Sequence, residues 1–227
     1  FELWFMSAKP DGVILYNVQT DVEMEKADFL SLNLEDSYLV FRYDLGSGMA
    51  DIVSPEKITL DVWHKVEVSR RQKQGMMIID DIITVTGSSQ GNLNELNLPK
   101  SLYIGGYPGD YHPSSGGTIG LRGAVQRFYE DGVRVEDLMG SAKSHKHVSQ
   151  YDGIPCPSYD NPCNNAGVCL ANLNDYECLC LEGYLGRTCD TEVSEINTDG
   201  PVSFAGNTHH RYPNKVNSKQ KCQRFNE

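Results

Sequence analysis

The first 155 residues of the chain contain no cysteine and no apolar run that approaches the length of a membrane span. A membrane-spanning helix needs about 20 consecutive apolar residues, so we expect no membrane insertion by this sequence. The opening residues, FELWFMSAKP, lack the basic start and apolar centre of a signal peptide and instead have the pattern of a strand interior. We therefore expect the chain to be a piece of a longer protein.

Catalytic motifs are also missing from the sequence. It contains no G-x-S-x-G turn, no glycine-rich phosphate loop and no H-E-x-x-H pair. His64 follows Trp63 in an expected strand, where a structural role is more typical than a catalytic one. The net charge of −11 disfavours nucleic acid as a partner. Two basic stretches, RRQK at 70–73 and HKH at 145–147, would suit a sulfated glycan and a metal, but such stretches are more often simply solvated. The sequence thus predicts a protein that is not an enzyme.

Short runs of alternating apolar and polar residues fill the part of the chain before the cysteines. Turn residues such as Gly, Asp, Asn, Pro and Ser separate them, and none has a convincing helical period. About ten strands at such close spacing predict an all-β fold, an antiparallel β-sandwich of jelly-roll type. The expected core residues are apolar positions of these runs: Phe5, Ile14, Leu30, Leu32, Phe41, Trp63, Val66, Val68, Ile78, Ile83, Leu102, Ile104 and Phe128.

Six of the seven cysteines lie between residues 156 and 189, separated by six, five, eight, one and eight residues. Zinc sites usually pair Cys-x2-4-Cys knuckles, which this spacing does not supply, and six cysteines permit fifteen disulfide pairings. A segment this short buries too little surface to fold without cross-links, so disulfides at roughly 2 to 4 kcal/mol each replace a core. Disulfides in turn predict a secreted or cell-surface location.

The cysteine spacing, with Gly183 and Tyr184 before the last cysteine, resembles an epidermal growth factor (EGF) module. The resemblance implies a small disulfide-rich fold with Cys156 paired to Cys169, Cys163 to Cys178 and Cys180 to Cys189. Calcium-binding EGF modules have D-x-[DN]-E-C at the first cysteine, whereas this chain has YDGIPC. The module is therefore expected to be a spacer without its own calcium.

The segment before the EGF module resembles a laminin G-like domain. Five motifs in order carry the resemblance: PDGVILYN, DFLSLNLEDSYLVFRYDLGSGMADI, WHKVEVSR, LYIGGYP and LRGAVQRFYEDG. A laminin G-like domain followed by an EGF module is similar to the arrays of agrin- and perlecan-type matrix proteins. The absence of a cysteine pair near the end of the sandwich makes agrin the nearer likeness, with a pikachurin-like relative left open.

The predicted organisation has three parts. Residues 1–150 form a laminin G-like domain without its opening strands, residues 151–190 form the EGF-like domain, and residues 191–227 form a linker and the start of a second laminin G-like domain. The stretch VSFAGNTHHRY in this tail is a candidate strand to pair with the open edge of the first sandwich. Cys222 has no partner among the other six cysteines, so its partner is expected beyond residue 227 or in another chain.

The laminin G-like resemblance also implies a calcium site at the sandwich rim. Its expected ligands are a carboxylate after the G-S-G turn, a side-chain oxygen before the L-Y-I-G-G strand, and two main-chain carbonyls. Asn97 and the carbonyls of Lys65 and Glu95 fit these roles. The carboxylate position is Met49, whose thioether is too soft for calcium, so Asp51 takes its place or the site is weak or lost.

These expectations converge on an extracellular-matrix or cell-surface adhesion fragment. Its partners are expected to be glycans or glycosylated receptors of dystroglycan type, or other matrix and cell-surface proteins, with calcium as the one cofactor to consider. The alternative is a neurexin-type receptor ectodomain that binds a protein partner.

Overall fold

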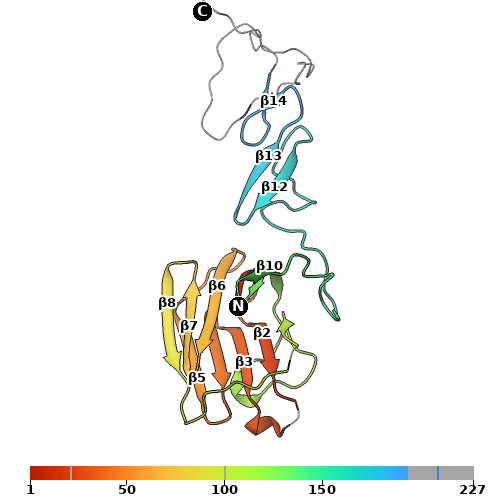
Figure 1. Ribbon diagram of the computed structural model, residues 1–227. Coiled ribbons are helices and arrows are strands. Elements are labelled where there is room, and N and C mark those ends of the chain that lie inside the picture. The colour runs from red at the N-terminus through yellow and green to blue at the C-terminus, as the bar shows by residue number, and fades with distance from the viewer. Residues whose placement is uncertain (21, 100, 194–208, 210–227) are drawn as a thin grey trace, which may run out of the picture.

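The computed structural model describes residues 1–20, 22–99, 101–193 and 209. It contains a β-sandwich with a smaller disulfide-rich module at one end (Figure 1). The predicted all-β class and the predicted order of the two parts are both confirmed. Among the described residues, the helical elements are two three-residue 3-10 turns, Met24–Lys26 and Pro113–Ser115, and no described helix has the length and apolarity to cross a membrane.

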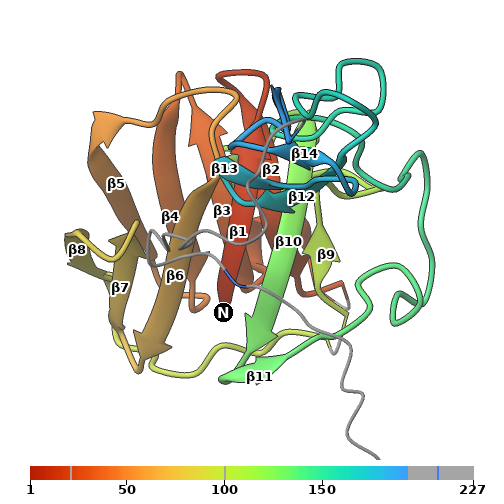
Figure 2. The ribbon, with the colours of Figure 1, turned by 90° about the horizontal axis from the view of Figure 1, so that it is seen from above.

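Two antiparallel sheets lie face to face in the sandwich (Figure 2). The six-stranded sheet has the order β11 (Val133–Arg134), β10 (Gly123–Glu130), β1 (Glu2–Ser7), β6 (His64–Arg71), β7 (Gln74–Ile79), β8 (Ile83–Ser88). The five-stranded sheet has the order β5 (Met49–Lys57), β4 (Tyr38–Asp44), β3 (Phe29–Glu35), β2 (Gly12–Val18), β9 (Tyr103–Ile104). Every run predicted from alternation contributes a strand, and β1 pairs on both sides, with β6 and β10.

The main core lies between the sheets, where the alternating apolar side chains of both inner faces meet. It contains large, fully buried side chains such as Phe5, Phe41, Tyr43 and Leu32. Most predicted core residues are buried, but Ile104 is 36% exposed, because its two-residue strand β9 forms the edge of the five-stranded sheet. Ile78 is half-buried, while Ile83 and Leu102 are partly buried and pack against the core from its margin.

A covering loop, residues 105–117, lies across the outer face of the five-stranded sheet. The buried carbonyl oxygen of Ser115 accepts hydrogen bonds from Ser31 Oγ at 2.9 Å and Asn33 Nδ2 at 2.6 Å, both on β3. The ring of His112 stacks on Phe29, with 4.4 Å between ring centroids. The loop also contacts β2, where Tyr16 Oη accepts the His112 N–H at 2.8 Å, and this strand is buried at all seven positions instead of showing the alternation of a strand with one solvated face.

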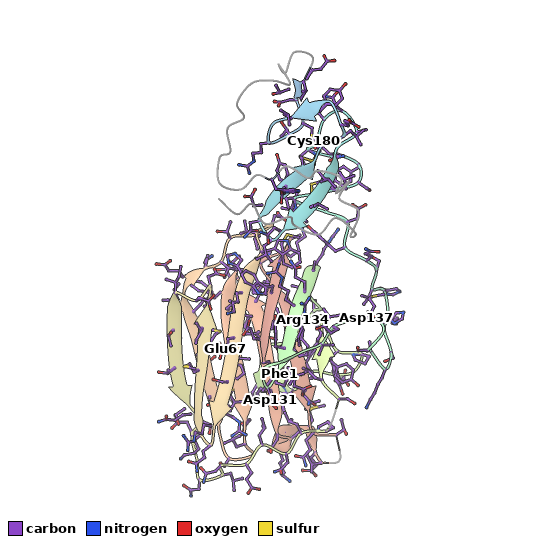
Figure 3. All side chains as sticks on the ribbon, turned by 45° about the horizontal axis from the view of Figure 1, so that its top comes forward. Phe1, Glu67, Asp131, Arg134, Asp137 and Cys180 are labelled. Carbon is purple, nitrogen blue, oxygen red and sulfur yellow. A yellow bond between two sulfur atoms is a disulfide. The ribbon has the colours of Figure 1, made fainter. Side chains whose placement is uncertain are left out.

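The disulfide-rich module contains two small hairpins, β12 (Val168–Asn172) with β13 (Asp175–Leu179), and β14 (Tyr184–Leu185) with β15 (Thr191–Glu192). Its disulfides join Cys156 to Cys169, Cys163 to Cys178 and Cys180 to Cys189, the pairing that the EGF resemblance implies. Figure 3 shows Cys180 in this module, remote from Glu67 on the sandwich, so the bridges lie at one end of the described structure.

His64 at the start of β6 is held by two acceptors. Its Nδ1 lies 2.7 Å from Asp80 Oδ2, and its Nε2 lies 3.0 Å from the carbonyl oxygen of Thr59. Burial lowers the pKa of His64, but the hydrogen bond and charge of Asp80 and the Thr59 carbonyl outweigh it, so the net shift is upward. Burial also opposes ionisation of Asp80, and the bonds from His64 and the Lys65 amide nevertheless lower its pKa.

We expect His64 to stabilise the fold more at low pH than at high pH. Because the folded pKa exceeds the unfolded value of about 6.5, the contribution is full below pH 6.5 and is lost as pH rises through the folded pKa. Urea unfolding of the wild type and His64→Gln at pH 6 and pH 9 should show a stability difference that shrinks by about 1 kcal/mol. A difference that does not change with pH would contradict a protonated His64, and Asp80→Asn should remove the pH effect.

Candidate functional site

A pocket of about 300 Å³ lies at the sandwich rim, beside the loop 89–99. Polar side chains dominate its lining, and two leucines complete it: Asn92, Asn94, Glu95, Asn97, Leu45 and Leu93. The side chains of Asn92, Asn94 and Glu95 are exposed and form no hydrogen bond with the described residues. They therefore present free amide and carboxylate groups to a ligand.

The loop that lines the pocket is fixed at several points. Asn97 donates from its backbone N–H to Asp28 Oδ2 at 2.7 Å, and Leu93 donates its N–H to Ser47 Oγ at 3.1 Å. Arg70 and Lys73, from the basic stretch 70–73, donate to the carbonyl oxygens of Asn94 at 3.2 Å and Gly91 at 2.8 Å. This basic stretch thus holds the pocket wall, a role that its sequence alone does not indicate.

The structure brings together only two of the residues predicted to bind calcium, Asn97 and Glu95, which both line the rim pocket. Asn97 Nδ2 also donates to Asp28 Oδ2 at 3.3 Å, so its amide group is turned toward a carboxylate. Met49 opens β5 directly after Ser47 and Gly48, which contact the pocket loop, and its side chain packs against the cluster that contains Tyr16 and Phe29.

Asp51 and Lys65 are already engaged elsewhere. Asp51 Oδ1 accepts from Arg42 Nε at 2.9 Å on the outer face of the five-stranded sheet. The carbonyl oxygen of Lys65 accepts the Asp80 N–H at 2.9 Å within the six-stranded sheet. The pocket loop is contacted by Arg70, near the far end of β6. Lys65 lies five residues earlier in this strand, and five strand residues span about 17 Å. The predicted four groups therefore do not fit one calcium coordination sphere.

Sequence reasoning missed the role of Arg42, which lies in the middle of β4. Its guanidinium pairs with both Glu35 and Asp51 and reaches the Ser115 carbonyl of the covering loop. An arginine inside the otherwise apolar run SYLVFRYD is the available signal, because a largely buried charge needs partners. The HKH stretch belongs to no group of three or more metal-binding side chains among the described residues.

The two modules meet at a junction that the sequence did not reveal. The side chain of Asn174, in the turn between β12 and β13, accepts from the Trp63 N–H at 2.7 Å and donates to the Trp63 carbonyl at 2.9 Å. The ring of Tyr151 meets the ring of Trp63 edge-on, and its hydroxyl lies 3.6 Å from Met6 Sδ. This junction fixes one end of the β12–β13 hairpin on the sandwich.

The predictions for the tail fall outside the described residues. Cys222 and nearly all of the stretch 201–212 belong to that part, so the partner of Cys222, the start of a second laminin G-like domain and the pairing of VSFAGNTHHRY with a sandwich edge stay predictions.

Family models match both modules, a Laminin G domain over residues 5–133 and an EGF-like domain over residues 156–188. These ranges lie within the predicted 1–150 and 151–190. The chain is 34% identical over 206 residues to the mouse Basement membrane-specific heparan sulfate proteoglycan core protein, covering 89% of this chain and 5% of that protein. It is 35% identical to Bos taurus Pikachurin, covering 83% of this chain and 19% of that protein.

Solved structures show the same fold. The mouse laminin alpha1 chain, domains LG4-5, aligns with a TM-score of 0.52 at 24% identity, covering 59% of this chain and 35% of that chain. The LG1-3 region of the laminin alpha2 chain aligns with a TM-score of 0.51 at 20% identity, covering 59% and 28%. At these identities the two structures show a shared fold and nothing further.

The matches to matrix proteins, with the EGF-like and laminin G modules, place the chain in the extracellular matrix. The expected perlecan-type likeness is confirmed, and the nearer likeness to agrin stays a prediction. Because the Laminin G domain family model matches residues 5–133, more than half of the chain, the chain belongs to the laminin G domain family, and an EGF-like domain follows its sandwich.

Proposed function

We propose that this chain is an adhesion module of the extracellular matrix that binds glycans, or glycosylated receptors of dystroglycan type, through its sandwich. The observation that carries the proposal is the rim pocket, whose free amide and carboxylate side chains match the hydroxyl groups of a sugar. The EGF-like module serves as a spacer with a fixed attachment to the sandwich. The role is binding and not catalysis.

The contacts that fix the pocket loop support this proposal. A site that is held before the ligand arrives loses less conformational entropy on binding. Ser47, Asp28, Arg70 and Lys73 all bond to the loop, so Asn92 and Asn94 project from an anchored backbone. The hydrogen bonds that this proposal needs come from side chains alone, and calcium stays a separate variable that the experiment includes.

A glycan array with the full chain tests the proposal. The array should carry neutral, sialylated and sulfated sugars, and it should be run with calcium and with a chelator. We expect retention of at least one sugar class, and we expect Asn92→Ala with Asn94→Ala to weaken it about tenfold, since two polar contacts are removed. Asn172→Ala, an exposed asparagine on the EGF-like module, is the matched control and should bind as the wild type does.

Two results would count against the rim pocket. Equal retention by the double variant would place the sugar elsewhere on the chain, and no retention of any sugar would remove the glycan proposal. Loss of sugar retention in the presence of the chelator would show that calcium takes part in binding. A protein partner is the second candidate function, favoured by the exposed apolar face described next.

A further inference from the structure

One face of the β12–β13 hairpin combines apolar side chains that are each about half exposed among the described residues. Val168 pairs with Leu179, and Leu170 pairs with Glu177, in the antiparallel register. Because side chains alternate along a strand and directly opposed residues share a face, these four project from the same side. We name Val168, Leu170, Glu177 and Leu179 the hairpin face.

The hairpin face gathers several half-exposed aliphatic side chains on one surface. Val168, Leu170 and Leu179 are 52%, 48% and 58% exposed. Leu181, two residues beyond the end of β13, is 51% exposed as well. Single exposed leucines are ordinary, but several neighbouring ones on one sheet face are typical of an interaction site.

The charge of the module around this face is predominantly negative. Between residues 156 and 193 the chain has six carboxylates, at Asp160, Asp175, Glu177, Glu182, Asp190 and Glu192, against one basic residue, Arg187. The guanidinium of Arg187 is engaged, 2.6 Å from Asp175 Oδ1 and over the ring of Tyr176. Glu177 on the hairpin face makes no ion pair with a described residue, so the module offers negative charge beside apolar surface.

The junction with the sandwich holds this face in place. Asn174, at the turn end of the hairpin, bonds to both backbone groups of Trp63, while Val168 and Leu179 lie at the opposite end of the same two strands. On the opposite side of the hairpin, the disulfide between Cys163 and Cys178 fixes β13. The surface is therefore preorganised, which lowers the entropic cost of binding.

We propose that the hairpin face is a docking surface for a basic, aliphatic segment of a protein partner. The aliphatic side chains of this segment cover Val168, Leu170 and Leu179, and its Lys or Arg side chains pair with Glu177 and the neighbouring carboxylates. Charge complementarity selects a basic partner over an acidic one. This surface is separate from the rim pocket, so the two proposals succeed or fail independently.

A labelled peptide Lys-Leu-Val-Leu-Lys tests the proposal on the full chain by fluorescence anisotropy and by amide NMR shifts. We expect a Kd of roughly 100 µM that weakens as salt is raised, with shifts confined to β12 and β13. Leu170→Ser with Leu179→Ser should weaken binding at least tenfold, because it removes the apolar contact. Glu177→Gln should weaken it about threefold. The control Ile82→Ser changes a more exposed aliphatic side chain on the sandwich and should have no effect.

Several outcomes would overturn the proposal. These are equal binding by the leucine double variant with its three disulfides verified, equal binding of the peptide Glu-Leu-Val-Leu-Glu, or no binding at millimolar peptide. The basic tail, with five basic residues and one acidic residue in 201–227, is the competing occupant. Binding that appears only after residues 194–227 are deleted would assign the face to that segment and not to a separate partner.

Discussion

Replacing Cys163 and Cys178 together by alanine is expected to unfold the EGF-like module and to leave the sandwich folded. Among the described residues of the module, the buried side chains are those of Cys163, Cys189 and Pro157, so the bridges stand where a hydrophobic core would be. Loss of a native disulfide from a small domain costs roughly 2 to 5 kcal/mol. This cost is as large as, or larger than, the whole free energy of unfolding expected for so small a module. Hydrogen exchange should show the amides of β12 and β13 unprotected and those of β3 and β4 still protected.

The same variant should loosen the junction, because Asn174 lies in the hairpin that unfolds. The edge-on contact of Tyr151 with Trp63 should then change, and Trp63 fluorescence reports it. Leu170→Ala is the matched control, since it alters an exposed side chain of the same hairpin and should leave the module folded. Protected β12 and β13 amides in the cysteine variant would show that the other two bridges suffice.

Gly123→Ala is expected to be the most damaging single substitution in the sandwich. Gly123 opens β10 and pairs with Ser7 of β1. A Cβ at this position would overlap the carbonyl oxygen of Met6 and lie 3.0 Å from the Cα of Ser7. Both are backbone atoms of β1, and they cannot rotate away as a side chain can. We expect the free energy of unfolding to fall by roughly 3 kcal/mol or more, measured by urea unfolding of the full chain.

Gly132→Ala separates this steric effect from the general effect of replacing a glycine. Gly132 has φ of 78° and no atom within 4 Å of an added Cβ, so alanine there meets only backbone strain. The expected cost is about 1 kcal/mol. A Gly123→Ala variant no less stable than Gly132→Ala would mean that β1 shifts freely, against the pairing of β1 on both sides.

The strands and the disulfides could be predicted because their signals are local. Alternation of apolar and polar residues identified the strands of the sandwich except the two-residue edge strand β11, which is too short to show alternation. The spacing from Cys156 to Cys189 identified the EGF-like module. The burial of the outer face of the five-stranded sheet could not be predicted from the sequence. It depends on the covering loop 105–117, which is held by contacts between distant residues, such as Ser115 with Ser31 and Asn33. Its sequence, rich in Gly, Pro and Ser, shows only that it is not a strand.

The candidate site was predicted only in part for a similar reason. Asn97 and Glu95 are near in sequence and both line the rim pocket. Lys65 was assigned by resemblance alone, and the course of β6 carries it away from that rim. The junction had no sequence signal at all, because Asn174 in the hairpin turn is an ordinary turn residue until Trp63 is placed beside it.

The Asn174 junction gives the molecule a mechanical coupling. Residues 135–155 connect the modules as a chain, but the two hydrogen bonds to Trp63 provide a second link, just before β6. Strand β6 is an interior strand, between β1 and β7. A partner that pulls or twists the EGF-like module therefore applies its force to the middle of the six-stranded sheet, where the load spreads over hydrogen bonds on both sides of β6. We therefore expect force on the module to reach the sandwich through Trp63 as well as through residues 135–155.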